Sequence, residues 1–234
     1  MSTGRKTSSI SIVIPTLNEE ALIGSTLTSL QGIPGVEIIV ADGGSHDRTT
    51  VLAGIHGGRV IAVSGGRAAQ MNAGAEAASG DILLFLHADT ILPPRFANHV
   101  RNVLSRKDVV AGAFRLAVDA PGAAVRLIET FANLRARLFS LPYGDQAIFL
   151  EASLFHAIGG FPDLSLMEDF ALVRALRQRG RIVILPEAAV TSGRRWQRLG
   201  ILRTTCLNQF IVVAYLFGVS PARLAGWYRK GQKR

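Results

Sequence analysis

The first 86 residues alternate short apolar runs with segments of helical periodicity, and few folds accommodate that order. Four apolar runs have the composition of strands: Ser11–Pro15, Val36–Ala41, Val60–Val63 and Ile82–Leu86. Helices are expected between them at Glu19–Leu30, after Asp47, and at Arg67–Ala78. Strands joined by helices of this length form right-handed crossovers in a parallel sheet. We therefore predict an α/β fold with a Rossmann-like, mostly parallel mixed sheet flanked by helices.

The second half of the chain is less regular. We expect strands near Val109–Val118, Ala147–Leu150 and Arg181–Leu185, and helices at Ala123–Phe139, Met167–Arg179 and Leu199–Phe217. No repeat or linker interrupts the chain. The predicted division is a flexible tail over residues 1–9, one α/β domain over 10–193 and a basic C-terminal helical extension over 194–234.

The positive charge is concentrated at the C-terminal end. Residues 194–234 hold nine Lys and Arg and no acidic residue, which accounts for the whole net charge of +9. Such a segment is typical of contact with phosphate-bearing ligands, an anionic membrane surface or nucleic acid. A solubilising tail explains the last few residues better than it explains Arg194, Arg195 and Trp196.

Two further features bear on the compartment. The single cysteine excludes an internal disulfide framework and a cysteine-based zinc site, which favours a reducing, cytoplasmic environment. Residues 204–222 carry no charge, but only Phe210–Val219 is apolar, about half of the roughly 20 residues that a span requires. We expect a buried or interfacial helix there, in contact with the inner face of a membrane or with a second copy in a homodimer.

Polar residues follow each strand of the first half, which parallel strands bring to one edge. They are Thr16 to Glu19, Asp42 to Ser45, Ser64 to Arg67 and His87 to Asp89. Pro93 and Pro94 prevent the fourth strand from continuing. Each cluster alone suits a tight turn, but four at one edge predict a ligand cleft with glycines where a phosphate approaches.

The content of this edge favours a nucleoside diphosphate over other ligands. Neither GxGxxG nor GxxxxGK[ST] occurs, so dinucleotide dehydrogenases and P-loop enzymes lose their main support. Asp42 can accept a hydrogen bond from a base or ribose. Asp89 can hold a hard divalent cation, Mn²⁺ or Mg²⁺, that bridges a diphosphate.

The motifs resemble those of glycosyltransferase family 2, whose fold is called the A type. The similar stretches are SIVIPTLNEE, VADGGSHDRT, GRAAQMNAGA, FLHADT, YGDQAIF, GGFP and MEDFALVRALRQRG, which run from residue 11 to about 180. Within the family, GRAAQMN, YGDQAIF and SGRRW resemble a small bacterial subgroup of arsenosugar-type or radical-enzyme-associated transferases. The resemblance implies that residues 10–193 form the catalytic domain.

The resemblance implies roles for the strand-end residues. The nucleotide pocket would be lined by Pro15, Thr16, Asn18, Glu19 and Ala88, Asp42 would read the uracil edge, and the nucleotide and sugar would lie beside Arg67, Gln70 and Asn72. Asp89 matches the last carboxylate of the family's Asp-x-Asp metal motif. His87 stands where the first carboxylate is expected, so its contact with ribose, metal or neither stays open. The alternative for Asp89 is a turn or N-cap residue.

The resemblance also implies catalytic and acceptor residues. Asp169 would be the base and Glu168 its support, although acids at the start of a helix also simply favour its dipole. Gly144, Asp145 and Gln146 would contact the acceptor, or form only a turn. Arg194, Arg195 and Trp196 partly match an arginine-tryptophan motif that processive relatives place near the acceptor and diphosphate, where arginines suit phosphate.

The sequence thus predicts an inverting glycosyltransferase that moves a sugar from a UDP-sugar to an acceptor hydroxyl by metal-assisted single displacement. Two alternatives remain. A sugar nucleotidyltransferase would need a glycine-rich basic loop after the first strand, which residues 16–19 do not provide. A non-catalytic nucleotide-sugar binding protein at the membrane surface is consistent with the missing first carboxylate. No nucleic acid partner is expected.

Overall fold

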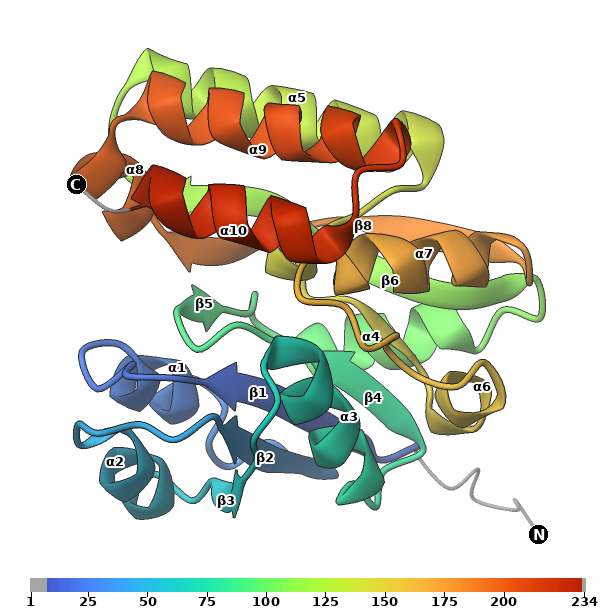
Figure 1. Ribbon diagram of the computed structural model, residues 1–234. Helices are drawn as coiled ribbons and strands as arrows, with labels where there is room; N and C mark the ends of the chain where they lie inside the picture. Colours follow the sequence, from blue (N-terminus) through green and yellow to red (C-terminus); the bar gives the residue numbers. More distant parts are fainter. Residues whose placement is uncertain (1–7, 233–234) are drawn as a thin grey trace, which may run out of the picture.

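A computed structural model describes residues 8–232, without the side chains of Arg195, Arg198, Leu202 and Gln232. Most of the predicted tail therefore lies outside the described residues. Eight strands form one sheet in the order β3-β2-β1-β4-β7-β6-β8-β5 (Figure 1). The strands are β1 Ile10–Thr16, β2 Val36–Asp42, β3 Arg59–Ala62, β4 Ile82–Phe85, β5 Thr90–Ile91, β6 Val109–Asp119, β7 Phe149–Glu151 and β8 Arg181–Ser192.

Helices cover both faces of this sheet and one of its ends. They are α1 Ile23–Thr28, α2 Thr49–Ile55, α3 Arg67–Glu76, α4 Phe96–Leu104, α5 Ala123–Phe139, the 3₁₀ turn η1 Gly144–Gln146, α6 Ala152–Ala157, α7 Glu168–Arg177, α8 Arg194–Leu199, α9 Ile201–Leu216 and α10 Pro221–Gln232. Of these, α4 and α6 lie in stretches for which no helix was predicted, whereas α8, α9 and α10 lie within the predicted C-terminal helical extension.

The strand pairing confirms the predicted α/β fold. β1 pairs in parallel with both β2 and β4, and β2 pairs in parallel with β3. β7 is antiparallel to both of its neighbours, β4 and β6, while β6 and β8 are parallel. The sheet is therefore mixed, with a parallel, Rossmann-like first half.

The central strands are buried on both faces, as their unbroken apolar runs predict. In β1, Ile12 belongs to the core beneath α1 and α4, whereas Val13 belongs to the core beneath α3 and α7. In β4, Leu84 and Phe85 divide between the same two cores. Because side chains alternate along each buried strand, the directions of the polar side chains that follow these strands are also fixed.

Three elements differ from the sequence prediction for physical reasons. α1 begins at Ile23 rather than Glu19, because residues 17–20 form a loop that hydrogen-bonds to the loop after β2. β8 continues beyond Leu185 to Ser192, and a shift in its register with β6 accommodates Pro186. A separate short helix, α8, precedes the expected last long helix, α9, and Gly200 divides the two with a φ of 83° that is unfavourable for other residues.

The C-terminal helices pack onto the domain. Ile211 of α9 and Leu224 of α10 are buried in one cluster with Met167 and Phe170, at the start of α7. Figure 1 shows α8, α9 and α10 grouped with α5 above the sheet. Among the described residues, no helix is long and apolar enough to cross a membrane.

Two glycines in helices should respond in opposite ways to replacement by alanine, because α3 packs closely on β1 at Gly74 whereas α2 is open at Gly54. A Cβ at Gly74 would lie 2.3 Å from Val13 Cγ1, so Gly74→Ala should lower the free energy of unfolding by about 1–3 kcal/mol. A Cβ at Gly54 in α2 meets nothing within 4 Å, so Gly54→Ala should raise it by about 0.5 kcal/mol. Urea denaturation measures both, and a neutral Gly74→Ala would contradict this packing.

Candidate active site

Asp42 is held by hydrogen bonds at the carboxyl end of β2. It lies in register with Thr16 of β1, whose Oγ1 donates to Asp42 Oδ1 at 3.1 Å. The Gly44 and Ser45 amides donate to Oδ2, and the Ser45 hydroxyl donates to Oδ1. Burial acts to raise the pKa of Asp42, but these hydrogen bonds outweigh it and hold the pKa below its ordinary value. All four acceptor positions of the carboxylate are used, so a nucleobase must replace one of these donors.

The loops after β1 and β2 are joined by hydrogen bonds. Asn18, in the left-handed region at φ 55°, accepts from the His46 amide at 2.9 Å and donates its own amide to Ser45 Oγ at 2.8 Å. The Glu19 amide donates to Thr49 Oγ1 at 2.7 Å. The two predicted nucleotide loops thus form one rigid edge.

Two residues predicted beside the nucleotide are bound to the backbone instead. Gln70 Nε2 donates to the carbonyls of Thr16 and Ala41 at 2.7 and 2.8 Å. Asn72 donates to the Phe161 carbonyl at 2.8 Å and accepts from the Phe161 amide at 2.9 Å. Neither side chain lines the cavity described next. Gln70 therefore holds the ends of β1 and β2 together, and Asn72 holds the distant turn at Phe161 in place.

An open cavity of about 230 Å³ lies between the sheet edge, the start of α7 and the C-terminal helices. It brings together many residues that the sequence singled out: Arg67, His87, Asp89, Gly144, Asp145, Glu168, Asp169 and Trp196. Pro15 lies by a small void behind it, and Ala88 is buried with its carbonyl accepting from the Thr26 hydroxyl.

Arg67 connects the end of β4 to the start of α7. Its Nη2 contacts His87 Nε2, and its Nε lies 3.4 Å from Glu168 Oε1. Burial, and secondarily the Arg67 charge, hold the pKa of His87 well below its ordinary value, so the ring is neutral at pH 7. Because Nε2 faces a guanidinium, we do not retain His87 as a metal ligand.

The two acids of α7 have different surroundings. Glu168 is buried, and its burial raises its pKa, with Arg67 opposing the shift and Asp169 adding to it. Asp169 Oδ2 accepts from the Gly144 amide at 2.7 Å, which fixes its carboxylate against η1. Met167, the residue before this pair, has φ 71°, a left-handed conformation that turns the chain into the helix.

Asp145 is a second acid in the cavity with a perturbed pKa. Burial is the largest cause and Asp169 adds to it, while Arg135 opposes it; together they raise the pKa of Asp145 to about 6. Its Oδ1 is buried and has no hydrogen-bond partner among the described residues. The carboxyl is therefore available to a ligand in the cavity.

Asp89 and Glu19 converge on one cation. Arg194 Nη2 contacts Glu19 Oε2 and lies 3.5 Å from Asp89 Oδ2. Thr191 Oγ1 lies 3.4 Å from the other Asp89 oxygen. Burial raises the pKa of Glu19, and the Arg194 pairing opposes the shift. Two carboxylate oxygens thus surround a single guanidinium nitrogen.

This arrangement bears on the predicted metal. In residues 8–232, no group of three or more His, Cys, Asp or Glu is placed to hold an ion. Mg²⁺ is commonly held by one or two carboxylates together with substrate phosphates. Asp89, with Glu19 beside it, fits an ion that arrives with a diphosphate and does not fit an all-protein metal cage.

The predicted acceptor residues divide. Gly144, Asp145 and Trp196 line the cavity, whereas Gln146 is fully buried and donates to the Phe114 carbonyl at 3.0 Å. Trp196 Nε1 is buried without a hydrogen-bond partner among the described residues. The Arg195 side chain lies outside the described residues.

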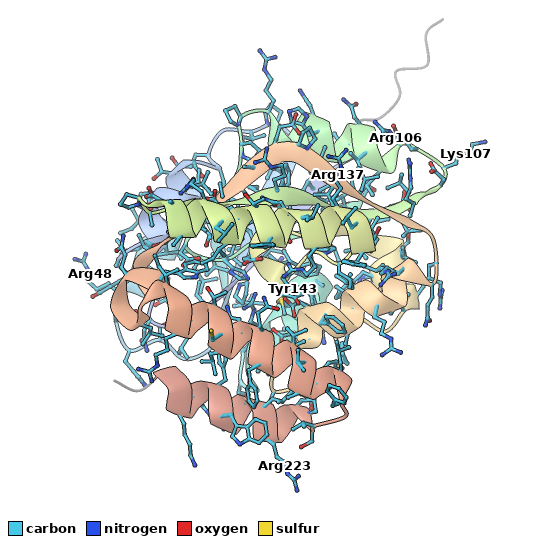
Figure 2. All side chains as sticks on the ribbon, turned by 90° about the horizontal axis from the view of Figure 1, so that it is seen from above. Arg48, Arg106, Lys107, Arg137, Tyr143 and Arg223 are labelled. Carbon is cyan, nitrogen blue, oxygen red and sulfur yellow. The ribbon has the colours of Figure 1, made fainter. Side chains whose placement is uncertain are left out.

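Sequence reasoning missed most of the far wall of the cavity. The missed part of that wall includes Thr191, Ser192, Asn208, Ile211, Val212 and Tyr228. Tyr143 is the first residue of the YGDQ motif and stacks under Arg135, whose Cζ is 3.4 Å from the ring centroid. Figure 2 shows Tyr143 in the interior, between α5 and α7. Its place in that motif was the signal for the acceptor side, whereas the segment of α9 was expected only as a buried or interfacial helix.

Comparison with known proteins identifies the family. The model described as Glycosyl transferase family 2 matches residues 11–161, more than half of the chain. The chain belongs to this family. The prediction made from the motifs is confirmed at that level, and the narrower subgroup stays a prediction.

This chain spans about a third of the length of the curated relatives that match it at 34–38% identity. Glucosyl-3-phosphoglycerate synthase from Mycobacterium tuberculosis is 38% identical over 96 residues, covering 36% of this chain and 30% of that protein. The mannosyltransferase PcManGT from Pyrobaculum calidifontis, solved with GDP-Man and Mn²⁺, has a TM-score of 0.68 at 19% identity, covering 96% and 70% of the two chains. S. aureus TarS 1–349, solved with UDP-GlcNAc, has a TM-score of 0.63 at 18% identity, covering 79% and 58%. These two structures show the fold.

The raised pKa of Asp145 predicts a pH-dependent gain in stability from its removal. The native state holds this proton more tightly than the unfolded state does, so the wild type loses stability as pH rises from 3.8 to about 6. Asp145→Asn should therefore be more stable than wild type by roughly 1–3 kcal/mol at pH 7.5, with the difference shrinking toward pH 4. Thermal unfolding across this range measures it.

The matched control is Asp163→Asn, which changes an exposed carboxylate. It should show no such pH-dependent gain. An equal response of the two variants would show that Asp145 does not titrate as a buried acid.

Proposed function

We propose that the protein is an inverting glycosyltransferase that moves a sugar from a nucleoside diphosphate, UDP, to an acceptor hydroxyl by single displacement. The observation that carries the proposal is one cavity lined by Asp89 from the end of β4 and by Asp169 at the start of α7. The first carboxylate suits the diphosphate side of a donor and the second suits the acceptor side. Family membership supports the same reaction class.

The donor would lie along the sheet edge. Gly43 and Gly44 there allow close approach of phosphates, and the Asp42 carboxylate is fixed as an ionised acceptor. A uracil N3–H is a donor that suits this carboxylate, and the exchangeable partner is the Ser45 hydroxyl. This is the basis for preferring UDP. A divalent ion shared by Asp89 and the diphosphate would stabilise the negative charge of the leaving group.

Arg194 must move away from Asp89 when an ion and a diphosphate enter. Two cations at one carboxylate oxygen repel each other, and among the described contacts the Arg194 guanidinium is held there by Asp89 and Glu19. Its guanidinium suits phosphate oxygens. Arg194 would thus neutralise the charges of Glu19 and Asp89 before the donor binds and contact the diphosphate afterwards.

Asp169 would act as the base. As the acceptor oxygen forms its bond to the anomeric carbon, the hydroxyl proton passes to Asp169, and the bond to the diphosphate breaks with its electron pair leaving on UDP. The Gly144 amide holds the carboxylate in one orientation, so little reorganisation is needed. Glu168 is paired with Arg67 and supports the geometry of that arginine.

Substitutions at the α7 acids test this assignment. Asp169→Asn keeps an oxygen for the Gly144 amide, so donor binding should be nearly unchanged while the rate of transfer falls by about 10²–10⁴-fold. Glu168→Gln should lose less. The measurement is UDP release from a panel of UDP-sugars, with water as the default acceptor hydroxyl.

Two outcomes would overturn the assignment. If Asp169→Asn keeps most of the rate, or if Glu168→Gln is the more impaired, the base is another group, and Asp145 is the next candidate. If the unmodified protein binds UDP-sugars but releases no UDP from any of them, either in water or with added sugar and lipid alcohols as acceptors, the protein is a binding protein and not a transferase.

Asp89 is tested through metal-dependent binding. Asp89→Asn should weaken UDP binding in the presence of manganese by roughly tenfold or more and leave metal-free binding much less changed. Glu20→Gln is the control, because Glu20 is a neighbouring carboxylate that accepts from the Arg48 amide. Calorimetric titration gives both constants. Equal enhancement by manganese in the two variants would remove Asp89 from the metal site.

A further inference from the structure

Helices α5, α9 and α10 form a layer that exposes an unusual amount of apolar surface. On α5, Leu127, Phe131, Leu134 and Leu138 recur at helical spacing and are 49–65% exposed. The opposite side of α5 packs on β6 through Val125. A solvated helix face is normally polar, so this apolar stripe indicates that something covers it.

A second stripe lies on α9. Phe210, Val213, Leu216 and Phe217 are exposed, Phe217 at 86%. The other side of α9 lines the cavity with Ile211 and Val212. Exposure is therefore confined to the side of the helix that faces away from the candidate active site.

The stripes belong to one surface. Figures 1 and 2 both show α5 and α9 side by side, with α10 next to α9. Trp227 of α10 lies against Phe210, with ring centroids 5.6 Å apart. We call this surface, formed by the two stripes and Trp227, the apolar face.

The charges around the apolar face are almost all positive. Exposed cations on its helices are Arg126, Arg137, Arg203, Arg223, Arg229 and Lys230. The one acidic residue in these helices, Glu129, is largely buried, pairs with Arg126 at 3.0 Å and accepts from the Val118 amide. In Figure 2, Arg223 projects away from the body of the protein at the α10 edge.

We propose that the apolar face docks onto an anionic lipid bilayer, with the helices lying in the plane of the interface. Apolar residues in the middle, cations at the rim and a tryptophan beside them are the features of interfacial helices. A second copy is disfavoured, because a two-fold contact through this face would oppose cations to cations. Since α9 also lines the cavity, docking would hold the candidate active site next to the membrane surface.

Vesicle co-sedimentation of the full chain tests the apolar contribution. The wild type should bind vesicles of phosphatidylcholine with about 30% phosphatidylglycerol. The double variant Phe131→Ser/Leu138→Ser should bind at least roughly tenfold more weakly, since each loses an apolar side chain from the interface. Val51→Ser/Ile55→Ser is the matched control, because these α2 residues are 54% and 69% exposed but lie outside the face.

A second pair tests the charge. Arg223→Gln/Lys230→Gln should weaken binding to anionic vesicles by roughly tenfold or more, and binding of the wild type should fall with salt. Arg106→Gln/Lys107→Gln removes the same charge from the opposite edge of the molecule in Figure 2 and should have a smaller effect.

Either of two results overturns the proposal. One is equal vesicle binding by Phe131→Ser/Leu138→Ser and its α2 control. The other is a wild type that does not bind vesicles and sediments as a dimer, while Phe131→Ser/Leu138→Ser sediments as a monomer. A second copy of the chain would then cover the apolar face. Circular dichroism of each variant establishes that it is folded.

Discussion

The candidate site depends on the parallel pairing of β1 with β2 and β4. Gln70 joins the carboxyl ends of β1 and β2 by hydrogen bonds to both strands. Parallel strands splay where their hydrogen bonding ends, which leaves carbonyls without partners. Gln70 donates to two of these, on Thr16 and Ala41, and the Gly43 amide donates to the Thr16 carbonyl. The Asp42 carboxylate then satisfies the amides of the following turn. The polar residues after these strands therefore share one edge, where hydrogen bonds join the loops that follow β1 and β2.

This arrangement of strand ends places arginines next to carboxylates at the candidate site. Arg67 lies between neutral His87 and the buried Glu168, while Arg194 lies between Glu19 and Asp89. Each arginine reduces the cost of holding a carboxylate in a partly desolvated place. Asp145 has no ion pair of this kind among the described contacts, which is consistent with its raised pKa. The cavity thus holds carboxylates and a guanidinium close together.

The sequence predicted the features that follow from local periodicity and strand order. The apolar runs of β1 and β4 predicted strands buried on both faces, and their alternation with helices predicted the parallel pairing. The topology predicted polar residues together at the strand ends, and Asp89 and Arg67 from two of these ends line the same cavity. The extent of α1 was wrong because its first expected turn forms hydrogen bonds to a loop about 28 residues away.

Contacts between distant segments could not be predicted in the same way. Asn72 is bound to Phe161 across 89 residues, and Arg194 reaches Glu19 across 175. Nothing in the local pattern distinguishes an amide that contacts a ligand from one that binds a distant backbone. The C-terminal helices were expected as an extension, but their contribution to the cavity wall depends on packing against α7 that no single segment encodes.

Hydrogen exchange on addition of UDP and manganese tests the central claim most directly, because the claim is that three strand ends form one donor site. The account predicts slower exchange, at the same ligand concentration, in residues 17–22, 43–48 and 87–90, with little change in α4. Exchange that slows elsewhere, or in only one of these three segments, would contradict a donor site at the carboxyl edge of the sheet.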